Sequence, residues 1–170
     1  MKYCALLIAI ALFSMTLSQE DCSGKTLNSD TTLNIGGRNV IVQFPSGFGS
    51  KPAPLLINYH PIMGSASQWK GGSQTARAAL SDGAVIAFMD GAQGPMGQAW
   101  NVGPCCTDAD DVQFTRDFIK EITSKACIDP KRIYAAGFSM GGGMSNMLDA
   151  SLLILLPLLL HLHSILPRKL

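Results

Sequence analysis

The stretch IYAAGFSMG at residues 133–141 decides the fold. Its first four residues are apolar or aromatic and begin with a β-branched side chain, which is typical of a buried strand. The next five, Gly137 to Gly141, have the G-x-S-x-G pattern of a nucleophile elbow, a tight strand-to-helix turn that exposes a serine hydroxyl at the top of a sheet. The sequence therefore predicts that Ser139 is a nucleophile at the end of a strand.

Strand and helix signals alternate in the chain before this elbow. Strand signals lie at 33–35, 39–44, 55–59, 84–88 and 133–136, and Gly36-Gly37 predicts a hairpin turn between the first two. Helices are expected at about 67–80, at 110–124 and from Met140 onward, with a Gly/Pro-rich loop at 91–106. This alternation predicts a parallel sheet with right-handed crossovers, and it matches the first five strands of an α/β-hydrolase fold.

The start of the second expected helix contains three carboxylates. Asp108, Asp110 and Asp111 lie where a helix start favours negative charge, and Thr107 is a capping-box candidate three residues before Asp110. Helix capping accounts for these residues without any ligand. A calcium site or a cluster of catalytic carboxylates is the alternative that the sequence leaves open.

The two ends of the chain differ from its middle. Residues 1–18 combine a cationic start, a short apolar run and small residues, which predicts a secretory signal peptide and an extracellular protein. Residues 149–170 form a leucine-rich tail that Pro157 interrupts. Both apolar stretches fall short of the ~20 residues that a membrane helix needs, so we expect no stable membrane association. The domain prediction is a signal peptide, a partial α/β-hydrolase domain at 19–148 and the divergent tail.

Charge argues against several classes of partner. The net charge is +1, and the lysines and arginines are scattered along the chain. No basic patch is therefore expected, and neither nucleic acid nor acidic lipid is an expected partner.

Four cysteines remain outside the predicted signal peptide. They are Cys22, Cys105, Cys106 and Cys127. An even number in an oxidising compartment predicts disulfides, and a zinc site is disfavoured because no second C-x-x-C or nearby histidine completes a tetrahedral set. A bridge between adjacent cysteines is the least expected pairing, since neighbours rarely reach disulfide geometry. We expect at least one bridge from the Cys105-Cys106 pair to Cys22 or Cys127.

Four motifs resemble, in order, those of secreted fungal type C feruloyl esterases, which in turn resemble polyhydroxybutyrate depolymerases. The motifs are HPIMGSASQW (60–69), AWNVGPCC (99–106), DDV (110–112) and CIDPKRIYAAGFSMGGGMS (127–145). The likeness runs from about Asp21 to Asn146 and covers the amino-terminal part of the α/β-hydrolase fold, with about five strands of a mostly parallel sheet and crossover helices.

The resemblance also implies an activity. It implies hydrolysis of ferulate esters on plant cell-wall arabinoxylan through an acyl-enzyme, without a metal or organic cofactor. Ser139 is then the nucleophile, and the Met140 N–H is one donor of the oxyanion hole. The loop after the third strand supplies the other donor. Because Pro61 has no N–H, that donor is expected at Ile62 or Met63. His60 is expected to belong to this loop, since the base follows the serine in such folds.

The residues after the elbow depart from the family. In the family pattern an Asp and then a His follow the serine, whereas nothing in residues 151–170 resembles the strands that present them. His161 and His163 are candidates by residue type alone. We therefore expect this chain to be truncated after the elbow relative to the family and to be inactive. A break near 147–150 also predicts that genomic DNA beyond the Asn146 codon encodes the missing strands in another frame or after splicing.

Three other functions remain as alternatives. The first is a related polyester or acetyl ester hydrolase. The second is a non-catalytic secreted fragment that binds aromatic or carbohydrate ligands through Trp69 and Trp100. The third is a membrane-tethered protein that uses both apolar ends.

The signal-peptide prediction gives a first testable outcome. The small residues Thr16-Leu17-Ser18 precede Gln19, so the exported protein should begin near Gln19. Amino-terminal sequencing of secreted material checks this. Retention of Met1 on that material would contradict the prediction.

Overall fold

The structure is a computed structural model, which describes residues 22–152 and, within them, side chains up to Leu148. The predicted signal peptide at 1–18 and residues 153–170 of the predicted tail lie outside the described residues. The description therefore covers the region that carries the four motifs.

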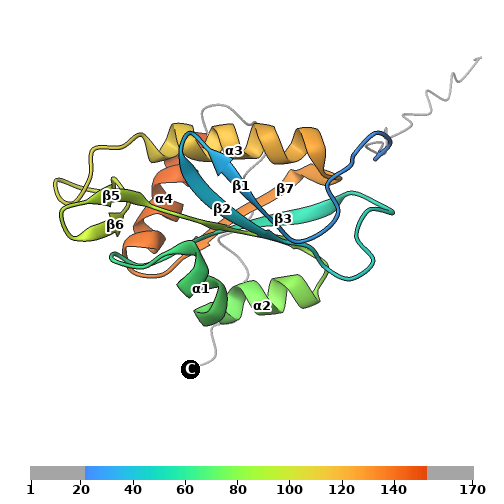
Figure 1. Ribbon diagram of the computed structural model, residues 1–170, viewed down its shortest axis with the longest axis horizontal. Coiled ribbons are helices and arrows are strands. Elements are labelled where there is room, and N and C mark those ends of the chain that lie inside the picture. Colours follow the sequence, from blue (N-terminus) through green and yellow to red (C-terminus); the bar gives the residue numbers. More distant parts are fainter. Residues whose placement is uncertain (1–21, 153–170) are drawn as a thin grey trace, which may run out of the picture.

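A five-stranded mixed sheet forms the centre of the fold, in the order β1-β2-β4-β3-β7 (Figure 1). Its strands are β1 (Thr31–Ile35), β2 (Arg38–Gln43), β3 (Ala53–Tyr59), β4 (Val85–Met89) and β7 (Ile128–Gly137). β3 pairs in parallel with β4 and β7, whereas the β1-β2 hairpin joins β4 antiparallel. All five predicted strands are present, and the α/β-hydrolase prediction is confirmed. Among the described strands, β7 pairs only with β3.

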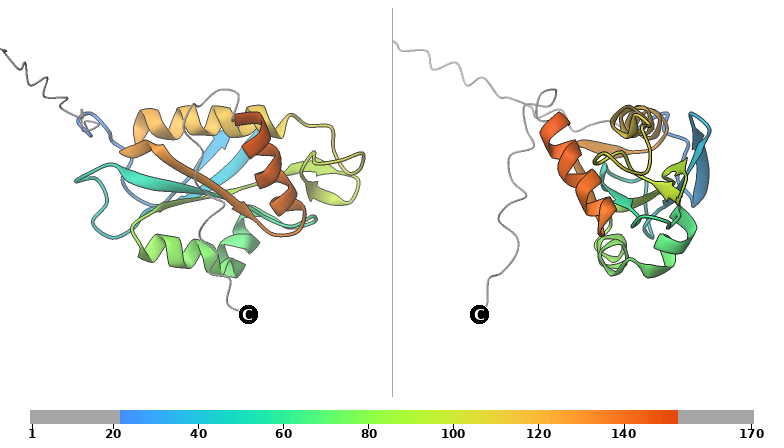
Figure 2. Two further views of the ribbon diagram at one scale, coloured as in Figure 1. Left: turned by 180° about the vertical axis from the view of Figure 1, so that it is seen from behind. Right: turned by 90° about the vertical axis from the view of Figure 1, so that its left-hand side faces the viewer.

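Two pairs of helices cover opposite faces of this sheet (Figure 2). α3 (Asp111–Lys125) and α4 (Met140–Leu152) pack on one face, and α1 (Ala66–Gly72) and α2 (Gln74–Ser81) pack on the other. The alternation of side chains along a strand explains this division, because Leu55 and Ile57 face α3 and α4 whereas Leu56 faces α1 and α2. None of the helices within residues 22–152 is long and apolar enough to cross a membrane.

The helix expected at 67–80 is in fact two helices. Ser73 ends α1 and begins α2, and its hydroxyl accepts hydrogen bonds from the Ala76 amide at 3.2 Å and the Asn58 side chain at 3.1 Å. The break follows Gly71-Gly72, where helix propensity is lowest. A buried serine cap therefore overrides the helical pattern that continues on either side of it.

The start of α3 resolves the alternatives for its carboxylates. Asp110 is the N-cap and accepts a hydrogen bond from the Gln113 amide at 2.8 Å, so helix capping is confirmed. Thr107 is not part of a capping box, because its hydroxyl accepts from the Ala109 amide instead. Asp111 is buried and forms an ion pair with Arg38. Within residues 22–152 no group of three or more metal-ligating side chains is present.

The cysteine pairing differs from the expectation. Cys22 bonds to Cys127, and the adjacent Cys105 and Cys106 bond to each other, so the predicted bridge between the two sets is wrong. Cys106 has a backbone φ of 84°, in the left-handed region, which helps turn two neighbouring side chains toward each other. The two bridges use all four cysteines within residues 22–152.

The loop expected at 91–106 contains a second, small sheet. It is a hairpin of β5 (Ala92–Gly94) and β6 (Gly97–Ala99). These three-residue strands are rich in glycine, so neither hydrophobic alternation nor β-propensity marks them in the sequence.

The buried ion pair gives a prediction about stability. Asp111→Ala should lower the free energy of unfolding by about 3–5 kcal/mol, because it leaves Arg38 without its partner. Glu121→Ala breaks the exposed pair with Lys125 and should lower it by less than about 1 kcal/mol. Urea unfolding of both variants checks this, and equal losses would contradict it.

Candidate active site

Ser139 lies on a turn between β7 and α4, where the strand runs directly into the helix (Figure 1). It is exposed to solvent, and its φ of 54° lies in the left-handed region, which residues other than glycine rarely adopt. Such a conformation costs of order 1–3 kcal/mol and persists only where the surrounding structure enforces it. The backbone therefore has the geometry of a nucleophile elbow.

The two glycines of the elbow are required by backbone contacts. A Cβ atom on Gly137 would lie 2.3 Å from the Gly141 carbonyl oxygen. A Cβ atom on Gly141 would lie 2.2 Å from the carbonyl oxygen of Tyr59 and 2.7 Å from that of His60. Since these neighbours are backbone atoms, no side chain can move aside. The first turn of α4 approaches the end of β3 this closely only because both positions lack a side chain.

The oxyanion hole was predicted to consist of the Met140 amide and one further amide, that of Ile62 or Met63. Met140 is the first residue of α4, so its N–H has no acceptor within the helix. The Met63 N–H donates to the Gln98 carbonyl at 2.8 Å, which occupies one of the two candidates from the loop after β3. Ile62 is thus the remaining candidate of the two, and its role as a donor stays a prediction.

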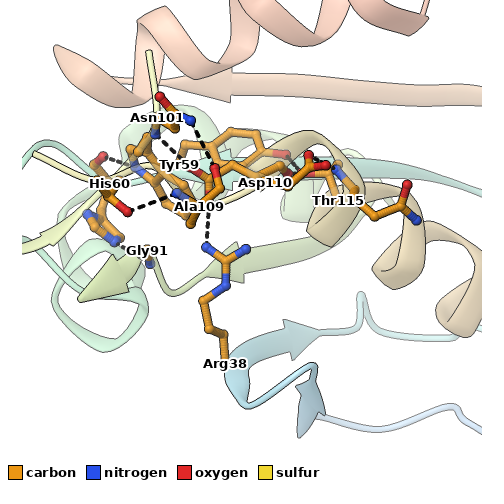
Figure 3. Close-up of polar contacts among 12 residues, drawn as sticks. Arg38, Tyr59, His60, Gly91, Asn101, Ala109, Asp110 and Thr115 are labelled. Atoms are coloured by element: carbon orange, nitrogen blue, oxygen red, sulfur yellow. Dashed lines mark hydrogen bonds and ion pairs between the residues drawn. The ribbon is translucent and has the colours of Figure 1, made fainter. Parts of the chain in front are cut away.

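His60 supports this loop from inside the protein (Figure 3). Its side chain is fully buried, its Nδ1–H donates to the Pro61 carbonyl at 2.7 Å, and its Nε2 accepts from the Gly91 amide at 3.0 Å. Burial lowers the pKa of the imidazole, in keeping with the neutral form that this pair of partners requires. Both ring nitrogens are occupied, so His60 is not positioned as a base. His161 and His163 lie outside the described residues.

Trp100 links the two sides of the site. Its indole N–H donates to the His60 carbonyl at 2.8 Å, and its amide N–H reaches the Met140 sulfur at 3.4 Å. Its ring packs edge-on against Tyr59. Because Trp100 has no exposed surface, it cannot contact a ligand, and the alternative in which it binds one is wrong. Trp69 is partly exposed and stacks on Phe138, with ring centroids 6.0 Å apart.

A buried polar network that the sequence did not predict fixes the neighbouring loop (Figure 3). Asp111 pairs with Arg38 and also accepts from the Asn101 amide at 2.6 Å. The Asn101 side chain donates to the Ala109 carbonyl at 3.2 Å, which ties both ends of the loop together. Asn101 and Asp111 both lie in the quoted motifs, whereas Arg38 is distant in sequence and no spacing pattern connects it to them.

A second buried chain of hydrogen bonds continues from the same helix. The Tyr59 hydroxyl donates to Thr115 Oγ1 at 2.9 Å, because the Thr115 hydroxyl itself donates to the Asp111 carbonyl. Burial raises the pKa of the Tyr59 phenol, so this group stays protonated and donates across the physiological range. The last residue of β3 is thereby anchored to α3.

Comparison with known proteins gives matches to esterases. Feruloyl esterase B of Piromyces equi is 88% identical over 110 residues, which are 64% of this chain and 20% of that protein. The probable feruloyl esterase C of Aspergillus clavatus is 29% identical over 162 residues, or 88% of this chain and 55% of that protein. The chain is a relative of the fungal feruloyl esterases. The resemblance inferred from the four motifs is therefore confirmed.

Solved structures agree about the fold. An acetyl xylan esterase from Aspergillus awamori superposes with a TM-score of 0.59 at 16% identity, over 72% of this chain and 47% of that one. No protein-family model matches the chain. The chain spans between one fifth and about half the length of these relatives. We therefore treat the activity of the whole protein as a proposal.

The elbow gives a prediction with an internal control. Gly141→Ala should lower the free energy of unfolding by at least about 3 kcal/mol, because the new methyl group meets two fixed carbonyls. Gly71→Ala lies in a helix with open space around it, and should be neutral or stabilising by up to about 1 kcal/mol. Urea unfolding separates the two. A Gly141→Ala protein as stable as the parent would contradict the close approach.

Proposed function

We propose that Ser139 is the nucleophile of an extracellular serine esterase that releases ferulate from plant cell-wall polysaccharide such as arabinoxylan. The observation that carries the proposal is the left-handed backbone of an exposed serine between a parallel strand and a helix. The relationship to fungal feruloyl esterases supports the choice of substrate.

The chemistry proposed is acyl transfer in two steps. Ser139 Oγ attacks the ester carbonyl while a base takes its proton, and the negative oxygen that develops accepts hydrogen bonds from the amides of Met140 and Ile62. Collapse of this intermediate expels the polysaccharide alcohol and leaves a feruloyl-enzyme. Water then hydrolyses the acyl group and frees the serine. Neither step requires a metal or an organic cofactor.

Among residues 22–152, no histidine is positioned to act as the base that the proposed mechanism requires. His60 is the one histidine there, and hydrogen bonds to backbone groups occupy both of its ring nitrogens. Ser139 therefore has its turn and its candidate oxyanion donors without a histidine positioned beside them. For this reason we propose that the 170-residue chain is a poor catalyst, although its lineage is that of an esterase.

An assay with methyl ferulate tests the nucleophile and the missing base together. We expect the 170-residue chain to hydrolyse it slowly, at most about 10⁴-fold faster than the uncatalysed reaction, since an oxyanion hole and binding supply about that much without a triad. Formation of a feruloyl-enzyme, detected as a mass increase on Ser139, should disappear in Ser139→Ala, whereas the slow rate that the oxyanion hole and binding supply should remain.

Two outcomes would overturn parts of this proposal. A feruloyl adduct that still forms in Ser139→Ala would remove Ser139 as the nucleophile. Rapid turnover that requires Ser139 would show that a base is present, and His161→Ala and His163→Ala would then identify it. Parallel assays with acetylated xylan distinguish the acetyl ester alternative, which predicts hydrolysis of that substrate in preference to methyl ferulate.

A further inference from the structure

The two disulfides of this protein differ in what they can contribute to stability. The Cys22–Cys127 bridge joins residues 105 apart in sequence and ties the start of the described chain to the residue before β7. Such a bridge stabilises the fold by constraining a long loop of the unfolded chain. The Cys105–Cys106 bridge joins neighbours, so it closes no chain loop and cannot stabilise the fold in this way. Its effect must be local.

The Cys105–Cys106 bridge is also the more accessible, since Cys105 is exposed and Cys106 partly exposed, whereas Cys22 is partly exposed and Cys127 almost fully buried. Cys105 is exposed, and an open cleft in the surface surrounds the pair, lined by Asn101, Gly103, Pro104, Thr107 and Asp108. Rates of thiol–disulfide exchange depend on access to the sulfur under attack. A small-molecule thiol can therefore reach this bridge in the folded protein.

The pair supports the β5-β6 hairpin. A Cβ atom on Gly94 would lie 1.9 Å from the Cys106 carbonyl oxygen, so the hairpin packs directly against the turn that the bridge fixes. At the other side of the same hairpin, a Cβ atom on Gly97 would lie 3.7 Å from the Met63 Cα, and the Gln98 carbonyl accepts the Met63 amide. The hairpin thus lies between the cysteine pair and the loop after β3.

The cysteine pair lies in the loop at 101–109. Hydrogen bonds that involve side chains hold the two ends of this loop but not its centre. Asn101 is fixed by Asp111, and Ala109 is fixed by Asn101. Between them, the backbone hydrogen bonds are short-range, such as that from the Thr107 N–H to the Cys105 carbonyl at 3.0 Å. The bridge is the strongest constraint on this segment, and opening it releases the turn while both ends of the loop stay anchored.

We propose that Cys105–Cys106 is a site of reversible exchange with small-molecule thiols, and that opening it loosens the β5-β6 hairpin and the loop at 60–64. An external thiolate attacks one sulfur, the Cys–Cys bond breaks, and the second cysteine leaves as a thiolate that takes up a proton. A second external thiol resolves the mixed disulfide. The net products are two cysteine thiols and one external disulfide, with two electrons transferred to the protein.

The first experiment measures selectivity. The folded 170-residue chain is treated with reduced glutathione at neutral pH, and free thiols are alkylated at intervals and located by mass spectrometry. Cys105 and Cys106 should become alkylated at least about tenfold faster than Cys22 and Cys127, because of the difference in access. Equal rates, or faster labelling of Cys22 and Cys127, would overturn the proposal.

The second experiment measures the consequence by hydrogen–deuterium exchange. After selective reduction, amides in 60–65 and 92–99 should exchange faster, while those of α2 at 74–81 should not change. The double variant Cys105→Ser/Cys106→Ser should show the same pattern without glutathione and no further change with it. Selective reduction that leaves exchange in 60–65 and 92–99 unaltered would also overturn the proposal.

Two further variants serve as controls, one at the other disulfide and one at Ser139. Cys22→Ser/Cys127→Ser should instead speed exchange near 25–27 and 126–128, where the backbone amides of Thr26 and Leu27 bond to the Lys125 carbonyl. The Ser139→Ala protein should give the same labelling and exchange as the parent. The result therefore does not depend on whether Ser139 is a nucleophile.

Discussion

The close contact between the first turn of α4 and the end of β3 is the constraint on which the site depends. Gly141 lies against the carbonyls of Tyr59 and His60, and no larger residue fits between these backbones. This contact sets the path of the chain from β7 into α4 and so enforces the left-handed conformation of Ser139. It also brings the Met140 amide to the same edge of the sheet as the loop after β3. Backbone packing thus places the candidate nucleophile and the candidate oxyanion donors at one edge of the sheet.

Buried polar side chains then fix the loops around that contact. His60, Trp100 and Asp111 are all buried, and each holds backbone groups of a different segment through hydrogen bonds. Buried polar groups are tolerated because they are paired, and losing one partner leaves the other unsatisfied. The site is therefore held by bonds from side chains to the backbone of loops that have little regular structure of their own.

The sequence predicts the features that depend on neighbours along the chain. The five strands and the elbow follow from local patterns of apolar residues and glycine, and the carboxylates mark the start of α3, although the cap is Asp110 and the predicted Thr107 capping box is absent. It does not predict features that arise from contacts between distant residues. Arg38 pairs with Asp111 across 73 positions, and the short glycine-rich strands β5 and β6 exist because of the elements that pack around them. The Ser73 break and the bridge between Cys105 and Cys106 likewise depend on tertiary context and local backbone turns.

The neutral imidazole of His60 makes the domain sensitive to acid. Its pKa is lowered from 6.5 in the folded protein, whereas the unfolded chain restores the ordinary value. Below about pH 6.5 the unfolded state therefore binds a proton that the folded state does not, and stability falls by up to about 1.4 kcal/mol per pH unit until the lowered pKa is reached. Protonation within the fold would turn Nε2 from an acceptor into a donor that faces the Gly91 N–H. Acidification thus acts first on the contact that supports the loop after β3, well away from the surface.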